Sequence, residues 1–517
     1  MRAWKAALPA MALMSLAFAA PAWAQKAKDT VRLAQVQTIP TIDAYLDPRP
    51  EVYFLRDAVY DTLITYDYGK REFVPLLAKA WRRIDDKTLE FDLREDVTWH
   101  DGKPFDADDV VYTINYLVDP DVVLRTKRDY EWMTGAEKLG PYKVRLNLRE
   151  GTPSDLALLS TQIQIYPKHV HGPLQDKVQF GQKPVGTGPY KVAEFDRNKG
   201  ILLQKRDAYP QGSAAKGPGR VGNIRVVAIA DAGARVAELL AGNIDVTRDI
   251  PANQADNLEK SGRFAVDLGD TFAVYYLMVD SRGRSGLKPL QDERVRRAIF
   301  MAIKHDDLAK VLVGSRSSQL RPPNGLCDPS QQGCVFTVKP PSYDPEGARK
   351  LLVEAGYGDG FDVTITTVSF FGGRLAEVIS GALRKIGIRA KVNTTTFAAY
   401  RDLQRDNKLE MMVNGWGGGS APDVAFTLDF LFTPGDRDYH GSEEVFKRVE
   451  ASRHELDKAK RDQMISGVFD TVTRMNYLIP ITRYPTLWVH TKELAVSGFD
   501  IRPMAPWGLT YEMLSWN

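Results

Sequence analysis

The sequence has few cysteines, almost no excess of either charge and, beyond its first residues, no long apolar run. Its 517 residues include 2 Cys, and 69 Lys and Arg stand against 66 Asp and Glu, giving a net charge of +3. This balance argues against nucleic acid or an acidic membrane surface as the main partner, because both are bound through a basic excess. No second apolar stretch approaches the length of a membrane-spanning helix.

Motifs for catalysis, cofactors and metals are also missing. Neither the phosphate-binding Gly-x-x-x-x-Gly-Lys-Ser/Thr nor the nucleophile motif Gly-x-Ser-x-Gly occurs. The Gly-Thr-Gly at 186–188 lacks the third glycine of a dinucleotide-binding loop, and a strand pattern follows it. His169 and His171, the closest pair of histidines, supply at most half of a zinc site. We therefore expect no cofactor, no metal and no catalysis.

The first 24 residues are typical of a secretory signal peptide. Arg2 and Lys5 form a positive start, residues 6–20 are mostly apolar, and Ala-Trp-Ala at 22–24 is a cleavage site. The alternative is a membrane anchor, but the apolar run is short for a span. The absence of a Cys at the cleavage point argues against a lipid anchor. We expect a soluble, exported protein that begins at Gln25.

The two cysteines, Cys327 and Cys334, lie in one loop rich in Pro, Gly and Gln. In an exported protein such a pair favours a disulfide that closes a short loop. A metal site would need more ligands than this loop offers. The sequence therefore predicts a disulfide here.

Strand and helix patterns alternate along the chain. Residues 362–368 read as a strand, 373–386 as an amphipathic helix, and 389–392 as the start of the next strand. This order predicts a parallel or mixed sheet covered by helices. The roughly 490 residues after the signal peptide exceed one ordinary core and indicate two or three domains.

The most informative stretch is 91–120, FDLREDVTWHDGKPFDADDVVYTINYLVDP. It predicts a strand, a turn at Asp101-Gly102 and a helix capped by Asp106. The stretch resembles the framework signature of family 5 extracellular solute-binding proteins, the receptors of peptide, nickel and oligosaccharide ABC importers. Further blocks are similar to that family in the same order along the chain: 73–81, 186–190, 240–246, 292–304, 343–357, 386–392 and 415–417.

The resemblance implies an α/β, two-lobe periplasmic-binding-protein fold, class II-like, with an extra subdomain in the first lobe. The boundaries carried over are 1–24 for the signal peptide; 25–48, 186–272 and 483–517 for lobe I; 49–185 for the inserted subdomain; and 273–482 for lobe II.

The resemblance also implies a function. The protein would be a monomeric periplasmic receptor that captures a small solute between its lobes and presents it to ABC permease subunits with cytoplasmic ATPases. Two other classes stay open. One is a periplasmic chaperone or signalling receptor with the same fold, and the other is an exported hydrolase, for which no local motif exists.

The glycine-flanked Trp416 is the main candidate for ligand binding. An apolar strand precedes it, and Gly415, Gly417 and Gly419 let a ligand approach the backbone closely. An indole offers a flat stacking face and one N–H donor. A Trp packed in a glycine turn is the alternative. The resemblance favours the functional interpretation, because in the family this loop faces the cleft.

The loop departs from peptide-binding members of the family. They carry an Asp three residues after this Trp, which pairs with the peptide's α-amino group, whereas this chain has Gly419 there and Asp423 four residues later. Dipeptide receptors also carry an Arg in the loop before the next helix, and 366–371 has none. A buried, unpartnered α-ammonium is costly, so a free dipeptide is disfavoured.

Four further residues are weaker candidates for ligand contact. Phe371 stands in the loop without Arg, and Tyr45 in the family's first-lobe loop near the cleft. Trp132 belongs to the inserted subdomain, and Tyr484 lies where the chain recrosses between lobes. For each, core or surface packing is an equal alternative.

Overall fold

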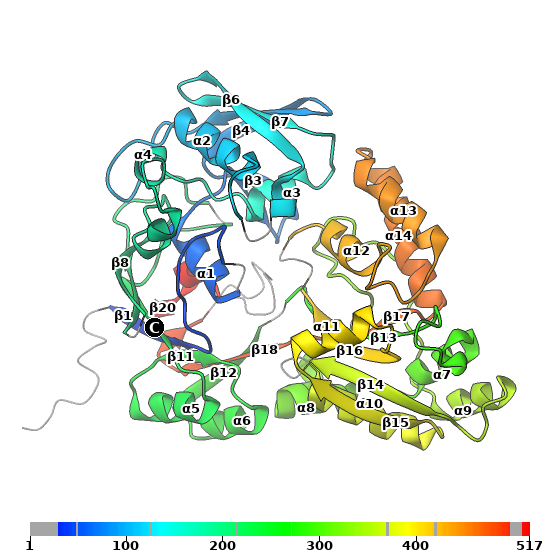
Figure 1. Ribbon diagram of the computed structural model, residues 1–517. Coiled ribbons are helices and arrows are strands. Elements are labelled where there is room, and N and C mark those ends of the chain that lie inside the picture. Colours follow the sequence, from blue (N-terminus) through cyan, green and yellow to red (C-terminus); the bar gives the residue numbers. More distant parts are fainter. Residues whose placement is uncertain are drawn as a thin grey trace, which may run out of the picture.

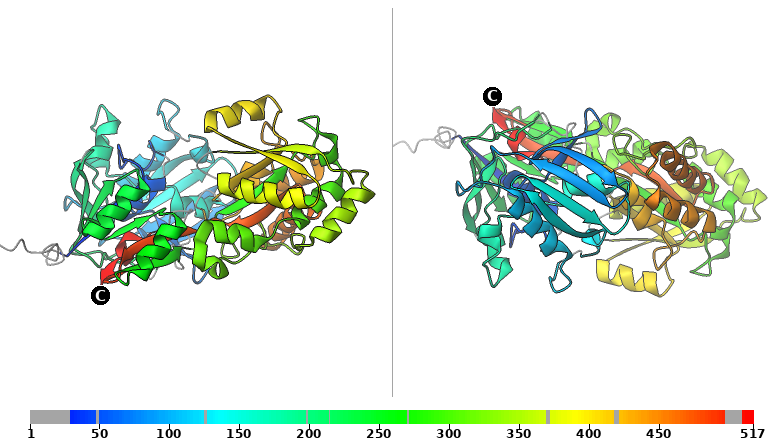
Figure 2. Two further views of the ribbon diagram at one scale, coloured as in Figure 1. Left: turned by 90° about the horizontal axis from the view of Figure 1, so that it is seen from below. Right: turned by 90° about the horizontal axis from the view of Figure 1, so that it is seen from above.

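The computed structural model describes residues 29–47, 50–124, 127–197, 199–213, 215–269, 271–368, 372–417, 421–496 and 509–517. The predicted signal peptide therefore lies outside the described residues. Two large sheets stand at opposite ends of an elongated molecule, and the other views show the same separation (Figures 1 and 2). We refer to the part built on the sheet of seven strands as lobe I and to the part built on the sheet of five as lobe II.

The sheet of lobe I has the order β12-β18-β11-β1-β10-β9-β8. The central β1 runs parallel to both neighbours, β10 and β11, and the outer pairs are antiparallel. Helices α5 (Ala232–Ala241) and α6 (Ala252–Lys260) cover one face, and α1 (Pro50–Val59) lies on the other side. The strands are β1 (Thr30–Gln35), β8 (Tyr190–Asp196), β9 (Gly200–Lys205), β10 (Asn223–Ala228), β11 (Val246–Arg248), β12 (Phe264–Gly269) and β18 (Thr486–Thr491).

The sheet of lobe II has the order β15-β14-β16-β13-β17. β14 runs parallel to β15 and β16, whereas β13 is antiparallel to β16 and β17. The strands are β13 (Val274–Val279), β14 (Asp362–Val368), β15 (Arg389–Thr395), β16 (Met411–Trp416) and β17 (Leu478–Arg483). The strand, helix and strand predicted from 362 onward are confirmed, with α10 (Gly373–Lys385) as the crossover helix.

Successive side chains of a strand point to opposite faces of the sheet, so this sheet has an apolar core on each face. Helices cover both cores. Leu277 and Val413 face one core, while Met278 and Met412 face the other. The first core is covered by α7 (Glu293–Met301), α8 (His305–Val313), α9 (Pro345–Glu354) and α10. The second is covered by α11 (Phe397–Arg405), α12 (Ala425–Leu431), α13 (Glu443–His454) and α14 (Lys458–Arg474).

A third, antiparallel sheet of order β4-β5-β7-β6 carries α2 (Ala107–Val118) on one face. We call this part the subdomain. The predicted cap is confirmed: the Asp106 carboxylate accepts from the N–H of Asp108 at 2.8 Å, and the N–H of Asp106 donates to the Asp109 carboxylate at 3.2 Å. The strands are β4 (Ala78–Asp85), β5 (Thr88–Leu93), β6 (Met133–Gly140) and β7 (Lys143–Leu148). The small elements around it are β2 (Ile64–Asp67), β3 (Glu72–Pro75), α3 (Asp155–Thr161) and α4 (Lys168–His171).

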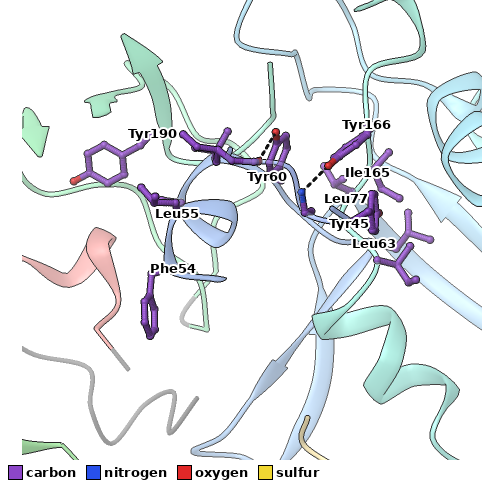
Figure 3. Packing of buried hydrophobic residues seen from close by; sticks show 14 of the residues in the cluster. Tyr45, Phe54, Leu55, Tyr60, Leu63, Leu77, Ile165, Tyr166 and Tyr190 are labelled. Atoms are coloured by element: carbon purple, nitrogen blue, oxygen red, sulfur yellow. Dashed lines mark hydrogen bonds between the residues drawn. The ribbon is translucent and has the colours of Figure 1, made fainter. Parts of the chain in front are cut away.

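The subdomain and lobe I share one hydrophobic core. Tyr45, Tyr60 and Tyr166 lie in it with their rings in contact (Figure 3). The Gly-Thr-Gly turn at 186–188 packs beside this core, where a Cβ on Gly186 would lie 1.9 Å from the carbonyl oxygen of Val59. The glycine is needed for this close approach, which agrees with the structural interpretation of the motif.

The chain passes between lobes I and II twice in the described residues, before β13 and after β17. We call 271–273 and 484–485 the crossing segments. The N–H of Tyr484 donates to the carbonyl of Ala273 at 2.9 Å, and Thr271 Oγ1 donates to the carbonyl of Tyr484 at 2.9 Å. The two segments are therefore bonded to each other. Where each domain begins and ends along the chain stays a prediction.

Candidate ligand-binding site

The carboxyl ends of the parallel strands of lobe II meet the crossing segments at one edge of the sheet. β14 and β16 are parallel and end at Val368 and Trp416. Val274, which begins β13, is registered with Trp416 on one side and with Arg483 on the other. Ligands of open α/β sheets bind outside the carboxyl ends of the strands. This edge is therefore the candidate site.

Trp416 is half-buried at this edge and belongs to an aromatic stack. Its indole lies parallel to the ring of Phe430, with the centroids 3.8 Å apart and an interplanar angle of 5°. Its Nε1–H donates to Thr427 Oγ1 at 3.1 Å, which fixes the ring orientation. The guanidinium of Arg437 lies 4.3 Å from the centre of the Phe430 ring, within cation–π range. The stack joins the end of β16 to α12 and the loop after it.

A cavity of about 100 Å³ opens beside this stack. β13, β14, α11, β16, α12 and Arg437 all contribute to its walls, which are mostly apolar and aromatic. Gly415, predicted from the sequence, lines it. Trp416 and Gly417 follow directly along the chain. Gly419 and Phe371 lie outside the described residues.

Polar groups in the cavity wall form a small network. Asn414 Nδ2 donates to the hydroxyl of Tyr400 at 2.7 Å, and Tyr276 lies beside them. Burial raises the pKa of Tyr400 to about 12 and also raises the pKa of Tyr276. Both hydroxyls therefore stay protonated at neutral pH and are available as hydrogen-bonding groups.

Asp423 forms a buried ion pair with Arg461. Both of its carboxylate oxygens accept from Arg461, at 2.7 and 2.8 Å, and the N–H of Ala425 donates to it at 2.8 Å. The side chain of Asp423 is fully buried and that of Arg461 is 6% exposed. These contacts favour a structural role for Asp423 over the predicted contact with a ligand.

The predicted disulfide between Cys327 and Cys334 is confirmed. The loop that it closes pairs with the chain just beyond the Trp416 loop. The N–H of Gln332 donates to the carbonyl of Pro422 at 2.7 Å, and the N–H of Val424 donates to the carbonyl of Gln332 at 3.1 Å. The disulfide loop therefore braces one end of the loop that carries Trp416.

The same loop contacts the other lobe. Arg483, at the end of β17, forms an ion pair with Asp328 at 2.8 Å. The hydroxyl of Tyr66, in β2, donates to the carbonyl of Ser330 at 3.2 Å. A brace that reaches both the crossing and the opposite lobe can transmit a change in lobe separation to the site.

Two of the remaining candidates lie in lobe I and the subdomain. Tyr45 is 3% exposed in the core of lobe I, and its hydroxyl donates to the carbonyl of Gln164. Trp132 packs on the subdomain core and donates from Nε1 to the carbonyl of Asp129 at 3.0 Å. Both placements favour packing roles. Their contact with a ligand stays a prediction.

Tyr484 lies in a crossing segment and stacks on Tyr275, with the centroids 4.5 Å apart at 13°. Burial raises the pKa of its hydroxyl. The stack stiffens the second crossing next to the sheet edge. A ligand contact of Tyr484 also stays a prediction.

Sequence reasoning missed most of the cavity wall. Tyr276, Tyr400, Asn414 and Arg437 stand on four separate segments, and none belongs to a motif. The one available local signal was Asn414, which directly precedes the Gly-Trp at the end of an apolar strand.

A family comparison decides what kind of protein has this geometry. Residues 72–438 match the middle region of the bacterial extracellular solute-binding proteins, family 5. The chain belongs to this family. It is therefore a substrate-binding protein of the ABC-importer type and not an enzyme, as the sequence predicted.

Individual relatives agree with this assignment. The solute-binding protein is 27% identical over 396 residues to the di/tripeptide-binding protein 1 of Pseudomonas aeruginosa, covering 71% of this chain and 72% of that one. It is 25% identical over 514 residues to the glutathione-binding protein GsiB of Salmonella paratyphi A, covering 96% of each. The fold matches NikA from Brucella suis in complex with Fe(III)-EDTA, with a TM-score of 0.81 at 22% identity, over 94% and 100% of the chains.

Proposed function

We propose that this solute-binding protein captures one small peptide-like, conjugated, chelated or aromatic solute between its lobes and delivers it to an ABC permease with cytoplasmic ATPases. The aromatic-walled cavity at the carboxyl edge of the lobe II sheet carries this proposal. Strand β13, which contributes Tyr276 to the cavity wall, begins directly after the first crossing segment and pairs with β17, which ends directly before the second. A solute that is held there and also contacts the opposite lobe would bias the lobes toward closure.

The solute class follows from the chemistry of the site and from the relatives. The relatives include di/tripeptide-binding and glutathione-binding proteins, and one solved relative is AgaA in complex with agropinic acid. This chain lacks an Asp at 419 and an Arg in 366–371. The chain therefore lacks the residues with which peptide-binding members of the family pair the α-ammonium and the α-carboxylate. An unmodified dipeptide is for this reason not the preferred solute.

The remaining parts of the proposal concern the exported form. The protein acts as a monomer in the periplasm after cleavage behind Ala24. Lobe I (25–48, 186–272 and 483–517) and its inserted subdomain (49–185) close against lobe II (273–482). No helix in the described part of the chain combines the length and the apolar character needed to cross a membrane.

Transport tests this proposal. Proteoliposomes that hold the permease and ATPase subunits encoded beside this gene should hydrolyse ATP faster with the solute-loaded protein than with Trp416→Ala protein prepared in the same way. Equal rates, or the absence of such genes, would contradict import and favour the chaperone or signalling role.

A further inference from the structure

A second cavity, of about 30 Å³, lies between lobe I and the subdomain. Its described wall comes mainly from the end of α1, from β2, from the end of α3 and from Lys216. Two wall residues also contact lobe II or a crossing segment. The hydroxyl of Tyr66 donates to the carbonyl of Ser330 in lobe II at 3.2 Å, and the ring of Tyr68 lies 5.3 Å from that of Phe272. The cavity therefore adjoins the surface that lobe I turns toward lobe II.

Gln164 supplies this cavity with a buried hydrogen-bond acceptor. The residue is 1% exposed. Its Nε2 donates to the carbonyl of Thr161 at 3.1 Å, whereas its Oε1 has no hydrogen-bond partner in the described part of the chain. The reverse orientation of the amide would turn its oxygen toward the carbonyl of Thr161, so this bond fixes the orientation. An unsatisfied buried acceptor is costly, and the cavity therefore favours a group that donates a hydrogen bond.

Three hydroxyl groups of the wall have already committed their protons to backbone carbonyls. Thr62 Oγ1 donates to the carbonyl of Ile64 at 2.6 Å. Ser160 Oγ and Thr161 Oγ1 donate to the carbonyl of Ala157 at 2.9 and 2.8 Å. A hydroxyl has one proton and two lone pairs. These oxygens can therefore accept a hydrogen bond from a bound group, but they cannot donate one without breaking a bond that they already make.

The charged residues of the wall do not reverse this preference. Lys216 is paired with Asp61 at 2.6 Å and also donates to the carbonyl of Tyr60 at 2.7 Å. Asp57 is the one described wall residue that is not buried, and its side chain is 22% exposed. Its ion pair with Arg56 is 3.6 Å long, which is beyond an ordinary hydrogen bond. Because a carboxylate only accepts, solvent and ligand reach the cavity past a further acceptor.

The volume limits what can enter. About 10–15 Å³ of such volume holds one water molecule, so a cavity of about 30 Å³ admits the end of a chain, roughly two heavy atoms. An amino or hydroxyl group with the carbon that carries it has this size and can donate. A carboxylate has three heavy atoms and no proton to donate, so it meets neither condition.

We propose that this cavity is a donor-selective subsite, which takes an amino or hydroxyl group at the end of a slim stem and holds it through Gln164 Oε1. This inference rests on the proposed function and narrows its solute class to molecules with such an arm. The arm would bind lobe I and the subdomain while the rest of the solute meets the lobe II edge, so that one solute contacts both sides of the cleft.

Three blocked dipeptides of nearly equal shape test the subsite by isothermal titration calorimetry. They are acetyl-Phe-Lys-amide and two analogues in which a hydroxyl or a methyl group replaces the terminal amino group of the Lys. The blocked ends remove the α-ammonium and the α-carboxylate, and the Phe supplies a ring for the lobe II edge. The wild-type protein should bind one or both donor compounds at least tenfold more tightly than the methyl compound, which leaves the acceptors unsatisfied. The compound that shows the larger preference identifies the end group as amino or hydroxyl.

Variants assign the preference to this cavity. Gln164→Leu should reduce the ratio of donor to methyl affinity to within about twofold. Ser160→Ala is the milder change, since it removes one accepting hydroxyl, and it should lower the ratio by about threefold. Gln254→Leu is the matched control, because Gln254, on α6, also has an Oε1 without a partner but lies outside the wall. It should leave the ratio unchanged. Thermal melting of each variant verifies that it is folded.

A crystal structure of the wild type with the tightest-binding compound should place the donor atom within hydrogen-bond distance of Gln164 Oε1. Four results would overturn the subsite: a water molecule at that position with the compound bound elsewhere, equal binding of all three compounds, binding of none of them, or an unchanged ratio in the folded Gln164 and Ser160 variants. Native mass spectrometry of the same preparations records whether a solute co-purifies. A co-purified solute together with any of these results would leave the proposed function standing and remove the subsite alone.

Discussion

Replacing Asp423 by Asn tests whether this carboxylate supports the fold or meets the solute. Asn keeps the size of the side chain but removes the charge that faces Arg461 at 2.7 and 2.8 Å. The partner would remain buried, at 6% exposure, without its counter-ion. Removing one member of a buried ion pair typically costs about 3–5 kcal/mol, because the remaining charge is uncompensated. We expect a loss of that size in the free energy of unfolding.

The effect has a control within the same lobe. Asp429 forms an ion pair with Arg453 at the same 2.7 Å, but the two side chains are 51% and 35% exposed. Exposed pairs contribute about 0–1 kcal/mol, so Asp429→Asn should change the unfolding free energy by less than about 1 kcal/mol. Urea unfolding followed by circular dichroism measures both variants against the wild type.

The interlobe contact of Arg461 adds a second readout. Its Nη2 donates to Ser154 Oγ, next to α3, at 3.3 Å. Loss of Asp423 should therefore loosen the contact between lobe II and the subdomain, and solute affinity should fall only modestly through altered closure. If Asp423→Asn protein unfolds within about 1 kcal/mol of the wild type while solute binding disappears, the structural assignment is wrong and Asp423 contacts the solute.

Three other changes give separate checks. Replacing Cys327 and Cys334 together by Ser should lower the unfolding free energy by about 2–3 kcal/mol, the chain-entropy value for so short a loop; urea unfolding that matches the wild type would contradict this. Trp416→Ala should weaken binding of a co-purified solute by at most a few kcal/mol in calorimetry, with Trp81→Ala, in the subdomain, as the unaffected control. Burial raises the pKa of Asp43 to about 6. The folded protein therefore holds this proton more tightly than the unfolded chain, so the free energy of unfolding falls as the pH rises from about 4 to about 6. Asp43→Asn should remove a loss of roughly 2 kcal/mol between pH 4 and pH 7. Identical pH profiles of the variant and the wild type would refute this.

The fold could be predicted where its signals are local. The cap at Asp106 and the strand, helix and strand from 362 onward depend on neighbouring residues, whose types and spacing are visible in the sequence. The two cysteines stand seven residues apart in a chain that is predicted to be exported, which leaves one obvious pairing. These predictions needed no knowledge of distant contacts.

The site could be predicted only in part, because its walls come from distant segments. Trp416 was visible through its flanking glycines, but Tyr276 lies 140 residues earlier along the chain, and only the antiparallel pairing of β13 with β16 brings them to one edge. Asp423 shows the opposite case, in which a distant contact favours a role that the local sequence does not suggest. It stands close to Trp416 along the chain, but its partner Arg461 stands 38 residues away on α14, outside any local pattern.

Native mass spectrometry of the protein, purified without denaturation and then incubated with a small-molecule extract of the growth medium, tests the central claim most directly. The account predicts a single adduct in one-to-one ratio, lost on denaturation and reduced in Trp416→Ala protein, with a mass that differs from every unmodified dipeptide. Solute-free protein under all these conditions, or an adduct that the Trp416 variant binds equally well, would contradict solute capture at the lobe II edge.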